Sequence, residues 1–154
     1  MQVTEQRYYS LEEYLALEEA ADYKSEYIDG EIVPMAGGSI NHNQIAGNFY
    51  AELNFAFKKL DYRVFMSDVR LWIAKRRIYT YPDVMVIVGE PEYDSDSPAG
   101  TLRDRTDTIT NPKVIVEVLS DSTKGYDRSG KFQAYRTLPT FAEYLLIDQT
   151  KIYV

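Results

Sequence analysis

The chain of 154 residues has a formal net charge of −7, and 45% of its residues are hydrophobic and 27% are charged. This length is enough for one domain with a sizeable core and short for two, and no apolar run approaches the roughly 20 residues that a membrane span needs. The acidic balance argues against broad, non-specific attraction to nucleic acid, and a chain without cysteine has neither disulfides nor thiolate metal ligands.

The two ends of the chain suggest where the protein resides and how far it extends. The first ten residues lack both a basic start and an apolar core, so they are not typical of a secretory signal. The lack of cysteine is compatible with a reducing interior, and we expect a cytoplasmic protein. We interpret residues 1–154 as a single domain, and because KIYV at 151–154 looks like a strand that is cut off, we expect the native chain to continue.

A helix and a hairpin are expected first. Ser10-Leu-Glu-Glu13 fits a capping box, because the serine can bond the first-turn amides while the glutamate reaches back. Apolar residues at helical spacing follow, and the pattern fades after Ala21. Asp29-Gly30 then suits the positive-φ positions of a tight turn. These patterns predict a helix from about Leu11 and a β-hairpin with strands near residues 26–28 and 31–34.

A long helix is expected to follow the hairpin. Gly37-Gly38 interrupts the preceding pattern, and Ser39 can cap the next element. Apolar residues then recur every three or four positions, at Ile45, Phe49, Leu53, Ala56 and Leu60. This spacing predicts a helix over residues 40–60 with one apolar stripe.

Three strands and a long loop are expected in the middle of the chain. Residues 62–67, 69–74 and 83–88 are rich in β-branched and aromatic side chains, with a turn at 75–77. Residues 89–112 have almost no apolar periodicity, which predicts a long surface loop. Such a loop either folds over a substrate, pairs with another chain or is a disordered insertion.

The last part of the chain alternates strand, helix and strand. VIVEVL at 114–119 is typical of a buried strand, helical spacing covers about 126–138, before Pro139, and EYLLID at 143–148 is typical of another strand. A helix between two strands makes a natural crossover between parallel neighbours. The order of elements predicts an α/β or α+β fold, with a mixed central sheet flanked by helices and preceded by the N-terminal helix and hairpin.

One carboxylate interrupts the apolar strand at 114–119. Alternation places Glu117 on the same face as Ile115 and Leu119, and both faces are otherwise apolar. A lone ionised carboxylate in a low-dielectric interior is costly, so Glu117 must be exposed, paired, protonated or bound to a metal.

A second carboxylate, Asp83, follows Pro82 at the start of another apolar run. An aspartate in this place often only caps a turn. If the two strands are neighbours, however, Asp83 and Glu117 come within reach of one ion. Oxygen ligands of this kind suit Mg²⁺, with Mn²⁺ as a substitute, because these ions bind through one or two carboxylates and keep several waters.

Six short segments occur in an order that carries a resemblance. They are Tyr-Ile-Asp-Gly-Glu (27–31), Met-Ala-Gly-Gly-Ser (35–39) with His42, Tyr-Pro-Asp-Val (81–84), Glu-Val-Leu-Ser (117–120) with Ser122-Thr123, Tyr-Asp-Arg (126–128) with Lys131 and Tyr135, and Glu-Tyr-Leu-Leu-Ile-Asp (143–148). Over nearly the whole chain this combination resembles the Uma-type restriction endonuclease family of the PD-(D/E)XK nuclease superfamily. The resemblance implies a restriction-endonuclease-like core, ordered helix, three strands, helix, strand, and Mg²⁺-dependent hydrolysis of DNA.

The resemblance also implies roles for particular residues. The metal ion would be held by Asp83, Glu117 and the carbonyl of Val118, and would bind the scissile phosphate and activate a water. The superfamily pattern places a lysine two residues after the glutamate, where this chain has Leu119. In this family the following helix supplies the lysine, and Lys131 is the matching position.

The same residues have plainer interpretations. Lys131 shares one side of the expected helix with Asp127 and Tyr135, and a solvated Lys131–Asp127 pair is the usual result of such a spacing. The lone histidine, His42, is accessory to the site or makes a structural hydrogen bond. Three further acids, Glu26, Glu31 and Asp68, are accessory site residues or surface charges. Of the tyrosines, Tyr135 matches a family position, and the others form a base-stacking platform, the core or an oligomer interface.

Three functions remain open from the sequence. The first is a Mg²⁺-dependent DNA endonuclease, for which the basic residues within 74–79 offer a local patch. The second is a catalytically inactive binding module with a nuclease fold, favoured by Leu119 and the acidic charge. The third is a hydrolase of another phosphate ester. Because one site per subunit suits the cutting of two strands by a two-fold assembly, we expect a homodimer.

Overall fold

The computed structural model describes residues 6–94, 106–120, 125–126 and 129–151. Its elements, in chain order, are α1 (Leu11–Ala20), β1 (Ser25–Ile28), β2 (Glu31–Pro34), α2 (Ile40–Ala56), β3 (Tyr62–Met66), β4 (Arg70–Ile73), the 3₁₀ turn η1 (Ala74–Arg76), β5 (Ile78–Thr80), β6 (Val84–Val88), β7 (Thr108–Ile109), β8 (Val114–Leu119), α4 (Gly130–Tyr135) and β9 (Glu143–Asp148). No helix within these ranges is long and apolar enough to cross a membrane.

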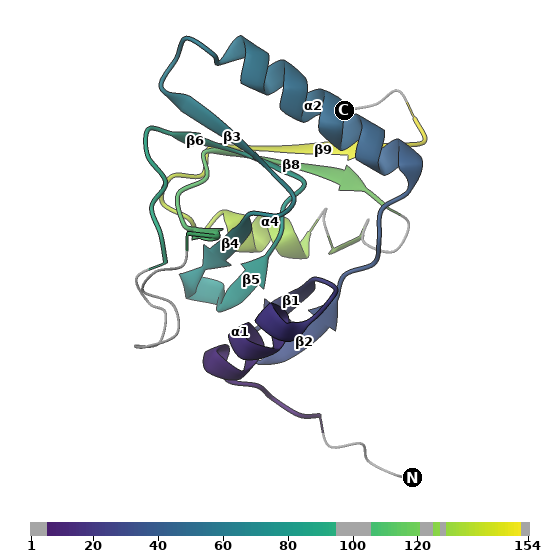
Figure 1. Ribbon diagram of the computed structural model, residues 1–154, viewed down its shortest axis with the longest axis vertical. Helices are drawn as coiled ribbons and strands as arrows, with labels where there is room; N and C mark the ends of the chain where they lie inside the picture. Colours follow the sequence, from purple (N-terminus) through teal and green to yellow (C-terminus); the bar gives the residue numbers. More distant parts are fainter. Residues whose placement is uncertain (1–5, 95–105, 121–124, 127–128, 152–154) are drawn as a thin grey trace.

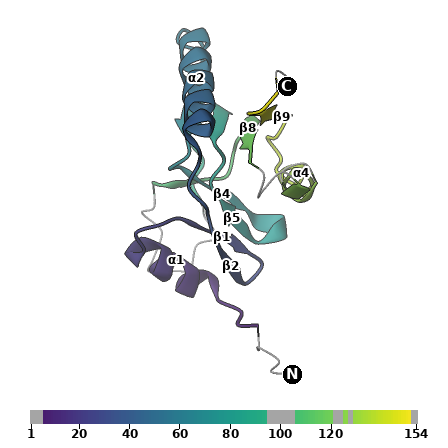
Figure 2. The same cartoon turned by 90° about the vertical axis from the view of Figure 1, so that its right-hand side faces the viewer.

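The strands form two mixed sheets. The first has the order β2-β1-β5-β4-β7 and the second the order β3-β6-β8-β9. In the second sheet β6 is antiparallel to β3 and β8, whereas β8 and β9 are parallel and are connected through α4. Figures 1 and 2 show α2 on one face of this sheet and α4 on the other. The order α2, β3, β6, β8, α4, β9 therefore confirms the expected core.

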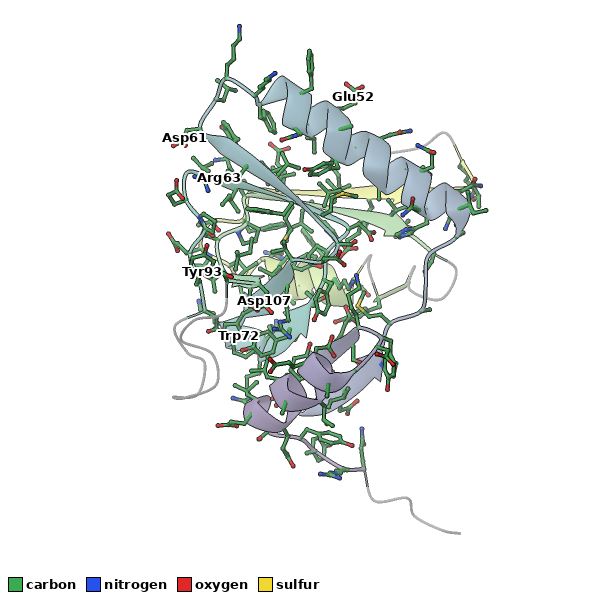
Figure 3. All side chains as sticks on the ribbon, in the orientation of Figure 1. Glu52, Asp61, Arg63, Trp72, Tyr93 and Asp107 are labelled. Carbon is green, nitrogen blue, oxygen red and sulfur yellow. The ribbon has the colours of Figure 1, made fainter. Side chains whose placement is uncertain are left out.

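Alternation along the central strands creates two hydrophobic layers. Val84, Val86, Val116 and Val118 pack with α2, and Met85, Ile87 and Ile115 pack with α4 and the first sheet. Glu117 follows Val116, so its side chain shares the α4 face with Ile115. On the far side of α2, Glu52 points away from the sheet (Figure 3).

The N-terminal helix and hairpin form as expected. Ser10 and Glu13 make both hydrogen bonds of the capping box at the start of α1. Asp29 and Gly30 adopt positive φ angles of 44° and 102° in the turn between β1 and β2. A Cβ on Gly30 would lie 2.8 Å from the Tyr8 ring, so both backbone and space require glycine there.

The long helix ends earlier than its apolar pattern predicts. α2 stops at Ala56, and Leu60, the last residue of the expected stripe, is 57% exposed. Instead Phe57 caps the helix and stacks on Tyr62 of β3, with ring centroids 4.8 Å apart. The chain must turn at this point to enter β3, so tertiary packing overrides the helical spacing.

The prediction of a surface loop over residues 89–112 is wrong for residues 108–109. Thr108 and Ile109 form the buried strand β7, which pairs with Arg70 and Leu71, and Tyr93 bridges to Ile109. Residues 95–105 lie outside the described residues. The short strand β5 was not expected either, because three residues are too few to show a period.

The third expected helix, over about residues 126–138, is shorter where the structure describes it. α4 covers Gly130–Tyr135, and residues 127–128, including Asp127 of the expected Lys131 pair, lie outside the described residues. Residues 152–154 of the expected terminal strand also lie outside the described residues. The strands expected at 114–119 and 143–148 are confirmed as β8 and β9.

Candidate active site

The candidate site lies where β8 extends beyond β6. The last residue pair of these two strands is Val84 with Val116, and β8 continues to Leu119 beside β9. Pro82 precedes this point and has no amide N–H with which to continue the ladder. Next to Pro82, the Asp83 side chain rather than the backbone contacts β8: its Oδ2 accepts a hydrogen bond from the Val118 amide at 2.8 Å.

The first turn of α2 places His42 beside Asp83. Ser39 caps this helix by accepting a hydrogen bond from the His42 amide, which fixes the start of the turn. The imidazole Nε2 then lies 3.2 Å from Asp83 Oδ2, and the side chains are 18% and 13% exposed. Figure 1 shows this end of α2 close to the end of β8.

The environment shifts the pKa values of both groups in the directions that favour an ion pair. Burial, the largest influence, raises the pKa of Asp83, but hydrogen bonds with His42, the Val118 amide and Glu117, together with the charge of His42, leave that pKa below its usual value. The hydrogen bond to Asp83 is the main cause that raises the pKa of His42, and it outweighs burial with help from the charges of Asp83 and Glu117 and a hydrogen bond with the Val118 backbone. His42 therefore faces both carboxylates and the backbone of β8.

Glu117 is held by two side chains from α4. Lys131 Nζ lies 3.2 Å from Glu117 Oε1, and the Tyr135 hydroxyl donates a hydrogen bond to the same oxygen at 2.7 Å. One helical turn separates these two residues, so they project from one side of α4, as expected. Burial and the nearby charge of Glu117 raise the pKa of Tyr135 well above its ordinary value, which keeps its hydroxyl a donor.

The first sheet adds Glu26 to the cluster. Tyr27 pairs with Tyr79, which places Glu26 opposite Thr80 on the other face of the β1–β5 pair. The Thr80 hydroxyl donates to Glu26 Oε1 at 2.5 Å, and Lys131 Nζ lies 3.3 Å from the same oxygen. Glu26, one of the candidate accessory acids, is therefore only 8% exposed and lies in the interior.

The cluster has the composition of a cation site. The carboxylates of Glu26, Asp83 and Glu117 face one lysine and one histidine, so the buried charge is negative whether or not His42 is protonated. Across the described residues, no three or more histidine or acidic side chains are grouped so that they could hold a metal ion by themselves. Asp83, directly before β6, and Glu117, on the neighbouring strand β8, nevertheless fit Mg²⁺, which binds through one or two carboxylates and keeps several waters.

Two accessory candidates lie elsewhere. Glu31 is on β2, where its carboxylate accepts a hydrogen bond from Gln6. Asp68 has a 95% exposed side chain 3.4 Å from Lys24. It lines a polar cavity of about 560 Å³ with Arg70, Tyr81 and the end of α1, and none of the cluster's charged residues lines this cavity.

The sequence did not indicate Thr80 as a site residue. Its position follows from β5, a strand too short to predict, and from the pairing of β5 with β1. Glu26 and Tyr27 are both buried although they lie on opposite faces of β1, and the hairpin sequence alone does not indicate this.

The fold and this arrangement define a restriction-endonuclease-like protein. A protein from Anabaena variabilis, described as a "putative nuclease belonging to DUF820", has a similar fold, with a TM-score of 0.70 and 20% identity over 91% of this chain and 74% of that chain. Residues 11–154 match the family Uma2, described as "Putative restriction endonuclease", and the chain belongs to this family.

Two relatives from Synechocystis sp. are more similar in sequence. The uncharacterized protein sll1609 is 48% identical over 137 residues, which are 89% of this chain and 73% of that protein. The uncharacterized protein slr1290 is 38% identical over 143 residues, which are 93% of this chain and 70% of that protein. Neither description assigns an activity.

Proposed function

We propose that this protein is a divalent-metal-dependent DNA endonuclease that cleaves phosphodiester bonds by hydrolysis. The observation that carries the proposal is the meeting of Asp83, Glu117 and Lys131 where β8 extends beyond β6. These are the three residue types that the family resemblance implies, and they come from two different strands and a helix. Leu119 stands where the superfamily has its lysine, and the contact of Lys131 with Glu117 from α4 supports Lys131 as its replacement.

Residues of this chain would bind the metal ion, orient its ligands and hold the attacking water. A Mg²⁺ or Mn²⁺ ion held by Asp83, Glu117 and the Val118 carbonyl would supply a water of lowered pKa and would offset charge on the phosphate in the transition state. His42 fixes Asp83, and Tyr135 fixes Glu117, so both carboxylates are oriented before the substrate arrives. Lys131 would hold the attacking water by donating a hydrogen bond to it.

The net charge of −7 is compatible with DNA as the substrate if positive charge is local. Lys75, Arg76 and Arg77 are exposed on the turn between β4 and β5. β5 leads from this turn to Thr80 and then to Asp83, so the turn and the cluster belong to one continuous stretch of chain. We assign the turn to contacts with the phosphate backbone, which position DNA without reading its sequence.

Cleavage of supercoiled plasmid in Mg²⁺ or Mn²⁺ tests the endonuclease. We expect wild type to nick or linearise the plasmid, and Asp83→Asn and Glu117→Gln to lose at least about a thousandfold of this rate, because each removes a charge that the metal needs. Glu52→Gln is the matched control, since this carboxylate lies on the outer face of α2. Cleavage that survives both site substitutions would rule out this site.

The inactive binding module is the second candidate, and one observation favours it. Lys131 already neutralises part of the acidic cluster, as a structural ion pair would. In that case Mn²⁺ should give no binding heat that depends on Glu117. Calorimetric titration of wild type and Glu117→Gln separates this module from the enzyme.

We also infer that two copies act together, because one cluster per chain would cut one strand of a duplex. Light scattering during size-exclusion chromatography should give twice the chain mass of 17.8 kDa. A monomeric mass, with and without DNA, would remove the homodimer from the proposal.

A further inference from the structure

A single lysine connects two glutamates inside the site. Lys131 Nζ lies 3.2 Å from Glu117 Oε1 and 3.3 Å from Glu26 Oε1, and Lys131 is 5% exposed. The two acids come from different sheets, Glu26 from β1 and Glu117 from β8, and the lysine comes from α4. The ammonium group is thus an internal counter-ion at the junction of three elements.

Glu26 is fixed independently of the lysine. Its carboxylate accepts the hydrogen bond from Thr80 on β5, the strand that leads directly to Asp83. On the opposite face of the same strand pair, Tyr27 and Tyr79 pack with α1 and anchor the hairpin. Glu26 therefore presents a stationary negative charge to Lys131.

Glu117, in contrast, has two uses for its charge. In the proposed function its carboxylate coordinates a divalent cation. Lys131 already lies within hydrogen-bonding distance of the same carboxylate. A lysine and a divalent cation on one carboxylate repel each other, and in a buried site this repulsion is weakly screened.

We propose that Lys131 and the divalent cation compete for Glu117, and that Glu26 is the positioning residue that retains Lys131 in the site when the cation binds. This inference rests on the proposed metal site. It adds Glu26 to that site and a shift of Lys131 when the cation binds. Lys131 moves its interaction from Glu117 toward Glu26, and its amine stays beside the cation, where the attacking water would be.

The competition predicts opposite effects of neighbouring substitutions on Mn²⁺ affinity. Lys131→Met removes the competing charge, so Mn²⁺ should bind about tenfold more tightly. Glu26→Gln leaves Lys131 with Glu117 alone, so Mn²⁺ should bind about tenfold more weakly. In the double variant Glu26→Gln/Lys131→Met the Glu26 substitution should have little effect, because the lysine on which Glu26 acts is absent.

Calorimetric titration of the purified full chain with Mn²⁺ measures these affinities without any substrate. Lys131→Gln is a second neutral variant whose amide can donate to both acids, and it should also tighten binding if Lys131→Met folds poorly. Lys131→Arg keeps the charge and should stay near wild type. Glu143→Gln, an exposed carboxylate on β9, is the control for a change of net charge. The Mn²⁺-induced rise in melting temperature gives the same ranking independently.

Unchanged or weaker Mn²⁺ binding in both neutral Lys131 variants would overturn the competition. A loss on Glu26→Gln that persists in the Lys131→Met background would show that Glu26 acts on the cation directly, and would overturn its positioning role. If these results occur while wild type still cleaves plasmid, the proposed endonuclease stands and only this inference fails. Absence of Mn²⁺ binding in every variant would overturn both.

Discussion

Two buried cations in this molecule are satisfied in different ways. Arg70 is 2% exposed, and its guanidinium lies 5.3 to 5.8 Å from the ring centroids of Tyr14, Tyr79 and Tyr81. Its Nε donates to the Thr108 hydroxyl at 3.0 Å, and the carboxylate of Asp107 beside it is half exposed. Lys131 instead lies between two buried carboxylates, and its amine is 5.7 Å from the ring centroid of Tyr126.

The difference indicates what each cation is for. Ring faces and neutral hydroxyls stabilise a guanidinium without creating an opposite charge that needs a further partner. The two carboxylates beside Lys131, together with Asp83 beside His42, leave negative charge that an added cation would offset. We therefore assign the Arg70 region to stability and propose that the Lys131 region binds a cation.

The largest expected effect on stability tests the Arg70 region. Arg70→Met should lower the free energy of unfolding by about 3 kcal/mol, because it removes the cation from three rings and leaves buried hydroxyls without a donor. Urea unfolding monitored by circular dichroism measures the loss. Mn²⁺ affinity should not change, and a change in affinity would mean that the two regions are coupled.

Two tyrosines, one in each region, test the comparison between the Arg70 and Lys131 regions through the loss of a single hydrogen bond. Tyr135 donates to Glu117 at 2.7 Å, and Tyr79 donates to Asp94 at 2.6 Å. Each Tyr→Phe substitution should lower the free energy of unfolding by about 1–2 kcal/mol, since each leaves a carboxylate with one donor fewer. Only Tyr135→Phe should also alter Mn²⁺ affinity in calorimetry; equal effects of both substitutions on the metal would contradict the assignment of Glu117.

The smallest expected effect is a pH dependence confined to the candidate site. The raised pKa of His42 means that its ion pair with Asp83 stabilises fully below the ordinary histidine pKa of about 6.5 and loses this contribution as pH rises through the folded pKa. The lowered pKa of Asp83 means that its contribution is present above about 3.9 and is lost as pH falls through its folded pKa.

The measurement compares wild type with His42→Gln by urea unfolding in EDTA. The stability difference between the two should shrink from about pH 6 to about pH 9, by less than about 1 kcal/mol. The same comparison for Arg70→Met should be flat over this range, because arginine stays protonated. A difference for His42→Gln that grows with pH would show that the neutral imidazole is the stabilising form.

Much of the fold was predictable because its signals are local. The capping box at Ser10 and Glu13, the Asp29-Gly30 turn and the apolar runs of β8 and β9 each fix an element through residues that are close in sequence. Two other predictions failed because the elements depend on residues distant in sequence. β7 is buried only because Arg70 and Leu71 lie beside it, and α2 ends at Ala56 because the chain turns into β3.

The sequence by itself determined that Glu117 must be exposed, paired, protonated or bound to a metal, since an ionised carboxylate alone in an apolar strand is costly. It also pointed, through the family resemblance, to Asp83 and Lys131. Only the tertiary structure decided that Glu26 and Thr80 join them while Glu31 and Asp68 do not. The physical reason is that alternation along a strand determines only which of its residues share a face. Which residues contact that face depends on the pairing of β1 with β5 and on the packing of α4.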